Sequence, residues 1–99
     1  MHVISRKKLI EFYEQRGRQD AKGQFEAWYD EAKRAQWESP ADVKAQYGLA
    51  SVIGDNRVVF NIAGNKYRLI VRINYNSKTV FVRFVGTHQE YYKIDAEVI

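Results

Sequence analysis

The segment from Val58 to His88 constrains the fold most, because apolar and polar residues alternate along three consecutive runs within it. Alternation with a period of two is typical of half-buried β-strands. Gly64-Asn65 separates the first run from the second and suits a two-residue hairpin turn that requires positive φ. Residues 76–78 (Asn-Ser-Lys) separate the second run from the third. The segment therefore predicts three antiparallel strands joined by two short turns.

A two-residue turn at Gly64-Asn65 sets the register of the first hairpin, with Ile62 opposite Tyr67. The facing of the other residues follows, because side chains alternate between the two faces. One face is wholly apolar and is expected to cover the core: Val58, Phe60, Ile62, Tyr67, Leu69, Val71, Val80, Val82 and Phe84. The opposite face holds Arg57, Val59, Asn61, Arg68, Ile70, Arg72, Phe81, Arg83 and Val85. This register sets Arg57 opposite Arg72, a like-charged pair that requires an explanation.

The first half of the chain has the periodicity of helices. Apolar residues recur at helical spacing from Phe25 to Ala32. Ser5 and Ser39-Pro40 each precede a further helical stretch and are typical of helix starts. Brief strands are expected at Met1–Ile4 and Ser51–Ile53. We therefore expect one α+β domain over residues 1–99, with N-terminal helices packed on one face of a three- to four-stranded antiparallel sheet.

Composition excludes several classes of protein. A chain of 99 residues suffices for one modest core. No apolar run approaches the roughly 18 residues of a membrane span, and the N-terminus lacks the apolar stretch of a signal peptide. The absence of cysteine excludes disulfides and thiolate metal sites, and it fits a cytoplasmic protein. With only two histidines and no ligand spacing, we expect neither a metal nor another cofactor.

The strand region is strongly basic and predicts a polyanionic partner. Arginine's planar fork suits phosphate oxygens, and Phe81 offers a stacking surface for bases. Basic and aromatic residues on a sheet favour single-stranded RNA over duplex DNA, which a recognition helix would read. Solvent-facing strand positions are often basic, which explains one or two of these charges but not four arginines on one face. The basic residues between Asn56 and Gln89, where no acidic residue occurs, are Arg57, Lys66, Arg68, Arg72, Lys78 and Arg83.

The same region holds groups suited to RNA cleavage. Cleavage without a metal needs a base for the 2′-hydroxyl, cations for the charge on phosphorus and an acid for the 5′-oxygen. His88 could serve as acid or base, Arg68 and Arg83 as charge stabilisers, and Tyr91 as a proton carrier or orienting group. Alternatively, His88 caps a backbone carbonyl at the strand end and Tyr91 packs behind the sheet. Glu90 is a candidate base, although an exposed glutamate is usually only solvated.

Two longer motifs resemble the HigB group of mRNA interferases within the RelE toxin superfamily. They are F-N-I-x-G-N-x-Y-R-L, beginning at Phe60, and V-R-F-V-G-T-H-x-E-Y, beginning at Val82. The opening MHVISRKKL and the internal segment AWYDEAKRAQWESPADVKAQY also fit, so the resemblance covers essentially the whole chain. It implies a RelE-like fold and ribosome-dependent cleavage of bacterial mRNA without a cofactor. It also implies neutralisation by a HigA-like helix-turn-helix antitoxin.

The resemblance implies catalytic roles for the four residues that match its motifs, namely Arg68, Arg83, His88 and Tyr91. Facing, rather than the resemblance, assigns Arg57, Lys66 and Arg72 to the RNA backbone, and Lys78 in the second turn is expected to bind RNA with them. The chain departs from the family pattern at Tyr92, where Asp is expected, so Tyr92 and Glu90 are possible auxiliary groups. Two alternatives remain open: a non-catalytic RNA- or ribosome-binding domain, and an arginine-rich module that binds an acidic protein segment.

Overall fold

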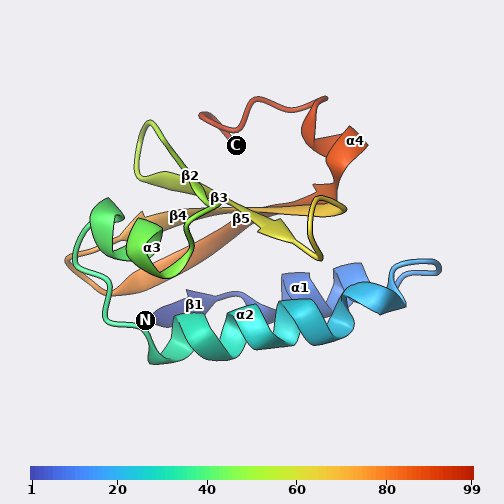
Figure 1. Ribbon diagram of the computed structural model, residues 1–99, viewed down its shortest axis with the longest axis horizontal. Coiled ribbons are helices and arrows are strands. Elements are labelled where there is room, and N and C mark those ends of the chain that lie inside the picture. Colours follow the sequence, from blue (N-terminus) through green and yellow to red (C-terminus); the bar gives the residue numbers. More distant parts are fainter.

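A five-stranded sheet forms the middle layer of the computed structural model, which describes residues 1–99 (Figure 1). Its strand order is β1-β5-β4-β3-β2. The elements are β1 (His2–Ile4), α1 (Arg6–Tyr13), a 3-10 turn (Gln19–Ala21), α2 (Lys22–Arg34), α3 (Pro40–Gln46), β2 (Ser51–Ile53), β3 (Arg57–Ile62), β4 (Tyr67–Asn74), β5 (Thr79–Thr87) and α4 (His88–Tyr91). None of the helices has the length and apolar composition needed to cross a membrane.

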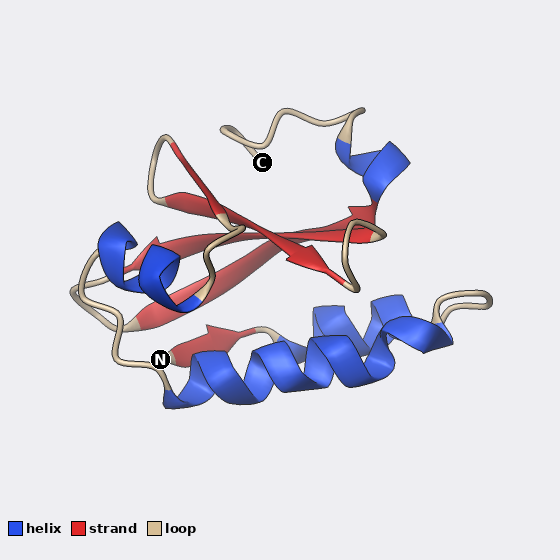
Figure 2. Ribbon diagram, viewed as in Figure 1, coloured by secondary structure: helices blue, strands red, loops and turns tan.

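The helices divide between the two sides of the sheet. Helices α1, α2 and α3 cover one side, whereas α4 and the C-terminal segment lie over the other (Figure 2). This confirms the expected α+β class with N-terminal helices on one face. The sheet is larger than expected and mixed, because β2 extends one edge and β1 pairs in parallel with β5 at the other. Local alternation reveals hairpins, but it carries no signal for a parallel partner more than 70 residues away.

The register of the β3–β4 hairpin agrees with the sequence prediction at all six pairs, from Ile62 opposite Tyr67 to Arg57 opposite Arg72. The turn itself differs in detail. Positive φ falls on Ala63 (55°) and Gly64 (67°), not on Gly64 and the residue after it. The turn is closed by a hydrogen bond from the Lys66 N–H to the Ala63 carbonyl oxygen at 3.3 Å. The apolar pattern therefore determined the pairing even though the turn conformation was inferred imperfectly.

A β-bulge in β5 corrects the predicted facing of its second half. Val82 pairs with Val71, but Phe84 pairs with Ile70, so Arg83 between them has no partner on β4. One extra residue reverses the alternation beyond it. Phe84 therefore faces away from α1–α3, and Val85 packs against the helix-covered core, which is the reverse of the prediction. The bulge was not evident from the sequence, because the residues on both sides of Arg83 are apolar and fit a strand with either facing.

The two sheet faces are named here for use below. The helix face carries Val58, Phe60, Ile62, Tyr67, Leu69, Val71, Ile73, Val80 and Val82. The arginine face carries Arg57, Val59, Arg68, Ile70, Arg72, Phe81 and Phe84. Aromatic residues from the helices pack on the first of these faces, with the ring centroids of Trp28 and Phe60 5.4 Å apart and those of Phe12 and Tyr67 also 5.4 Å apart. The core is thus an aromatic layer between α1–α3 and the sheet.

Both predicted helix starts occur where expected. The Ser5 hydroxyl accepts a hydrogen bond from the Lys7 N–H at 3.2 Å, so Ser5 is the N-cap of α1. Helix α3 begins at Pro40, but the Ser39 side chain makes no capping hydrogen bond. The carboxylate of Asp42 in the first turn accepts instead from the Glu38 N–H at 2.9 Å.

Candidate active site

Helix α4 places His88 at the end of the central hairpin. Thr87 ends β5 and caps α4: its hydroxyl accepts from the Glu90 N–H at 3.1 Å, and the Glu90 carboxylate accepts from the Thr87 N–H at 2.9 Å. This reciprocal arrangement is a capping box. The His88 N–H also donates to the Lys66 carbonyl oxygen at 3.1 Å, which attaches the helix start to the β3–β4 turn. The backbone around His88 is therefore held from both sides.

Arg68 and His88 form the central contact of the site. Gly86 lies opposite Arg68 on β5, so the turn into α4 brings the imidazole within hydrogen-bond distance of the guanidinium, with Nη2 and Nδ1 2.7 Å apart. A guanidinium only donates hydrogen bonds, so Nδ1 accepts and the neutral ring carries its proton on Nε2. Arg68 also donates to the Asn65 side-chain oxygen at 2.8 Å and to the Asn65 carbonyl oxygen at 3.1 Å. Two hairpin residues thereby orient the guanidinium toward His88.

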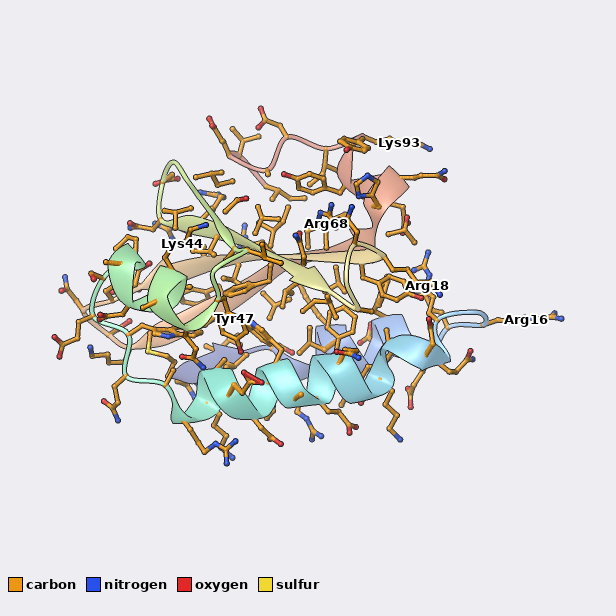
Figure 3. The ribbon with its side chains drawn as sticks, in the orientation of Figure 1. Arg16, Arg18, Lys44, Tyr47, Arg68 and Lys93 are labelled. Atoms are coloured by element: carbon orange, nitrogen blue, oxygen red, sulfur yellow. The ribbon has the colours of Figure 1, made fainter.

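Arg68 is only 8% exposed, yet none of its hydrogen-bond partners carries a negative charge. Figure 3 shows it on the side of the sheet that faces α4. The Tyr91 ring lies over the guanidinium, with 5.7 Å between Cζ and the ring centroid. Cations with neutral partners retain their attraction for an anion such as a phosphate. The arrangement therefore combines an imidazole with an uncompensated positive charge.

Glu90 is placed close to the site but is engaged structurally. Its carboxylate caps α4 and also accepts from Arg18 Nη2 at 3.1 Å. The hydrogen bond from the Thr87 backbone N–H, together with the nearby charge of Arg18, lowers the pKa of Glu90 below its usual value. A lowered pKa makes a carboxylate a poorer base. This geometry favours a positioning role for Glu90 over the role of general base.

Tyr92 stands next to His88 at the surface. Its ring is perpendicular to the imidazole, with centroids 4.6 Å apart, and the residue is 72% exposed. Tyr91 and Tyr92 lie with their ring centroids 5.9 Å apart. The aromatic ring therefore occupies the position where the family resemblance leads one to expect a carboxylate.

The like-charged cross-strand pair of Arg57 and Arg72 is explained by the different environments of the two side chains. Arg57 is buried, and Nη1 pairs with the Asp55 carboxylate at 2.7 Å. Its Nε and Nη2 donate to the carbonyl oxygen of Ile99 at 3.0 and 2.7 Å. Arg72 is exposed to solvent. Arg57 thus holds the C-terminal segment on the sheet, and only Arg72 offers a free charge.

The remaining sequence-derived candidates are dispersed. Arg83, at the bulge, donates to the Ile99 carbonyl oxygen at 3.4 Å and lies about 10 Å along β5 from the position opposite Arg68, at about 3.3 Å per residue. Lys78 lies at the far end of the sheet, where Nζ donates to the Trp37 carbonyl oxygen at 3.1 Å. Lys66 lies beside His88 and is paired with Asp20. Lys66 is thus close to the central contact, whereas Arg83 and Lys78 are not.

The structure adds residues that local patterns did not single out. An open groove of about 490 Å³ runs beside His88 and is lined by Arg16, Arg18 and Lys66, among others. Asn65 was read only as a turn residue, although its place before Y-R in the hairpin motif could have suggested contact with Arg68. Arg16 and Arg18 lie in a polar connection with no local signal of function. No three His, Asp or Glu side chains are grouped closely enough to hold a metal ion.

Comparison with known proteins identifies the family. A family model described as HigB toxin, the RelE-like toxic component of a toxin–antitoxin system, matches residues 21–94. The match includes the whole β3–β4–β5 meander and α4, and therefore Arg68 and His88; the opening MHVISRKKL lies outside it. A search of curated proteins finds no match. Because the family model covers well over half of its residues, this chain belongs to the HigB toxin family, the RelE-like toxic component of toxin–antitoxin systems.

Proposed function

We propose that this toxin is an endoribonuclease that cuts mRNA during translation, with its active site on the arginine face. The observation that carries the proposal is the 2.7 Å contact between Arg68 and His88, in which the cation has no anionic partner. Family membership supports a toxic activity controlled by an antitoxin. Translation as the target, and hence a cytoplasmic site of action, are part of the proposal and follow from the family resemblance.

The proposed chemistry is attack of the RNA 2′-oxygen on the adjacent phosphorus, with cleavage of the bond to the 5′-oxygen. Arg68 stabilises the additional negative charge on the phosphoryl oxygens. Once the guanidinium turns to the phosphate, His88 Nδ1 is released from Arg68 and takes up a proton, and the resulting imidazolium donates its Nε2 proton to the leaving 5′-oxygen. The proton of the 2′-hydroxyl passes through water to Nδ1, so the imidazole is neutral again after the step, and Tyr91 orients the guanidinium. The scheme requires no metal ion.

Lys66 is proposed to contact the RNA backbone beside the central contact, and Arg72, which is exposed but lies about 13 Å along β4 from Arg68 at about 3.3 Å per residue, is proposed to contact a more distant phosphate. Arg57 and Lys78 fit this role less well, since both side chains are engaged within the protein. Arg83 is proposed to contact a more distant phosphate from its position at the bulge in β5. The partner that silences the toxin is proposed to be a HigA-like helix-turn-helix protein that covers the arginines or displaces His88.

Induction of the wild-type chain in a bacterial host, followed by mapping of mRNA 5′ ends by primer extension, tests this function. We expect growth arrest and new 5′ ends within translated frames. His88→Ala should abolish both effects, whereas the exposed control Arg34→Ala on α2 should retain them. Arrest without new 5′ ends would replace cleavage by a non-catalytic ribosome- or RNA-binding function.

A further inference from the structure

We propose that the groove beside His88 is a subsite for the phosphodiester backbone of the RNA strand flanking the cut, an inference that rests on the proposed function. Three separate segments build it: the α1–α2 connection, the β3–β4 turn and the start of α4. We call it the flanking groove, and the residues that line it include Arg16, Arg18, Asn65, Lys66 and His88. Because His88 forms one wall, a strand lying in the groove leads directly to the reacting phosphate.

The charge of the flanking groove fits a polyanion. The permanently charged residues that line it are all cations: Arg16, Arg18 and Lys66. Two acidic residues lie just outside and are already engaged: Asp20 with Lys66, and Glu90 with Arg18. Arg16 makes no ion pair or hydrogen bond through its side chain, and Figure 3 shows it extending from the α1–α2 connection. Arg16 is therefore free to bind a phosphate.

Arg18 is held in place before any ligand arrives. Its guanidinium lies over the Phe12 ring at 4.5 Å from the centroid and donates to the Gln15 side-chain oxygen at 2.9 Å. The third contact is with Glu90, the residue that caps the helix bearing His88. Side chains held in this way lose little conformational entropy when a phosphate binds. The flanking groove is thus coupled to the site through Glu90.

Asp20 limits the affinity of the flanking groove. Its Oδ2 pairs with Lys66 Nζ, and its Oδ1 accepts from the Tyr67 hydroxyl at 2.8 Å. The hydrogen bond from Lys66 lowers the pKa of Asp20, so the carboxylate is charged at neutral pH. Asp20→Asn keeps an oxygen for Tyr67 but removes the charge that neutralises Lys66. The proposal therefore predicts opposite effects on RNA binding for two nearby substitutions: Arg16→Gln should weaken it and Asp20→Asn should strengthen it.

The test measures binding of a short single-stranded RNA with 2′-O-methyl groups, which cannot be cut because the attacking hydroxyl is blocked. Binding to the intact chain is followed by fluorescence anisotropy over a range of salt concentrations. Each phosphate contact contributes about 0.7 to the slope of log affinity against log salt for a single strand. We expect Arg16→Gln to lower the slope by about 0.7 and Asp20→Asn to raise it by about as much. The control Arg34→Gln, equal in charge loss but at the far end of α2, should leave the slope unchanged.

Equal slopes for Arg16→Gln and Arg34→Gln, or no binding by the wild type at about 50 mM salt, would overturn the subsite. Failure of the subsite and failure of the proposed function are distinguishable. A toxin that cuts mRNA in the host but shows no Arg16-dependent slope retains its function and loses the subsite. A chain that shows the expected slopes but produces no new mRNA ends retains the subsite as an RNA-binding groove and loses the nuclease activity.

Discussion

The two faces of one sheet are built on opposite principles. The helix face meets α1–α3 through apolar and aromatic side chains and contains no buried charge. The arginine face is also largely covered, with Val59 and Ile70 at most 3% exposed, but it includes both of the buried charged residues, Arg57 and Arg68. The helix face is thus part of an apolar core, whereas the arginine face holds positive charges at fixed positions beneath a thin covering segment.

The contrast between the two buried arginines supports the proposed placement of the function at Arg68. Burial of an unpaired charge is costly, so a fold normally supplies an anionic partner. Arg57 has such a partner in Asp55, whereas Arg68 contacts only neutral groups. Proteins tolerate such local departures from good design chiefly at functional sites. The uncompensated charge of Arg68 beside His88 therefore favours the proposed functional role over a purely structural one.

The largest expected effect on stability comes from the helix face. Phe60→Ala should lower the free energy of unfolding by about 3–5 kcal/mol, because a buried ring is replaced by a cavity among Trp28, Trp37 and Tyr47. Equilibrium denaturant unfolding measures the change. Leu49→Ala, at a residue 82% exposed, is the control and should stay within about 0.5 kcal/mol. A loss below about 1 kcal/mol for Phe60→Ala would contradict the aromatic core.

Cross-strand neighbours on the arginine face should respond differently. Arg57→Ala should cost about 1.5–3 kcal/mol of unfolding free energy, because it removes charge-assisted hydrogen bonds to Asp55 and Ile99. Arg72→Ala should change stability by less than about 0.5 kcal/mol, because its side chain is exposed. Thermal and denaturant unfolding of both variants checks this. Equal losses would show that Arg57 is not a structural arginine.

Lowering the pH should remove the stabilising contribution of Glu90, which caps α4, the helix that holds His88. The pKa of Glu90 is lowered in the folded chain, so its contribution to stability is present above the unfolded value of 4.5 and is lost as pH falls through the folded value. Unfolding measured from neutral pH down to about pH 3 should therefore show the stability gap between wild type and Glu90→Gln closing with acid. Glu11→Gln on α1 serves as the matched loss of a carboxylate. A gap that stays constant with pH would exclude this linkage.

The smallest expected effect concerns the exposed ring beside the imidazole. Tyr92→Ala should reduce mRNA cleavage about threefold to tenfold, because an aromatic contact with His88 is worth about 0.5–1.5 kcal/mol. Tyr92→Phe keeps the ring and should cut within about twofold of wild type. Both variants should unfold like wild type. If Tyr92→Phe is as impaired as Tyr92→Ala, the hydroxyl rather than the ring serves the reaction.

The sequence predicted the central hairpin to the residue because burial forces its register. A slip by one position would place Arg68 and Arg72 on the helix face, where no partner awaits them. Helical periodicity likewise identified α2, and the brief strand expected at Ser51–Ile53 is β2. The bulge at Arg83 escaped detection, because Val82, Phe84 and Val85 are apolar on either facing.

The sequence indicated which residues of the candidate site lie close together, but not how their side chains pair. His88, Arg68 and Tyr91 occur in adjacent motifs, so their proximity follows from the meander. The ion pairs Lys66–Asp20 and Arg18–Glu90 join residues 46 and 72 positions apart, and only the packing of α1 and α2 on the sheet brings them together. No local pattern reports contacts of that range, which is why Glu90 was taken for a candidate base and Arg18 was overlooked.

The central claim is that Arg68 and His88 act as one unit, and a double-mutant cycle on single-turnover mRNA cleavage by ribosome complexes tests it most directly. His88→Ala and Arg68→Met, which retains the buried stem, should each lower the rate about 10²–10⁴-fold, with folding confirmed by thermal unfolding. If the pair is a unit, the double variant should be no slower than the slower single variant. Losses that multiply in the double variant would show two independent groups and contradict the account.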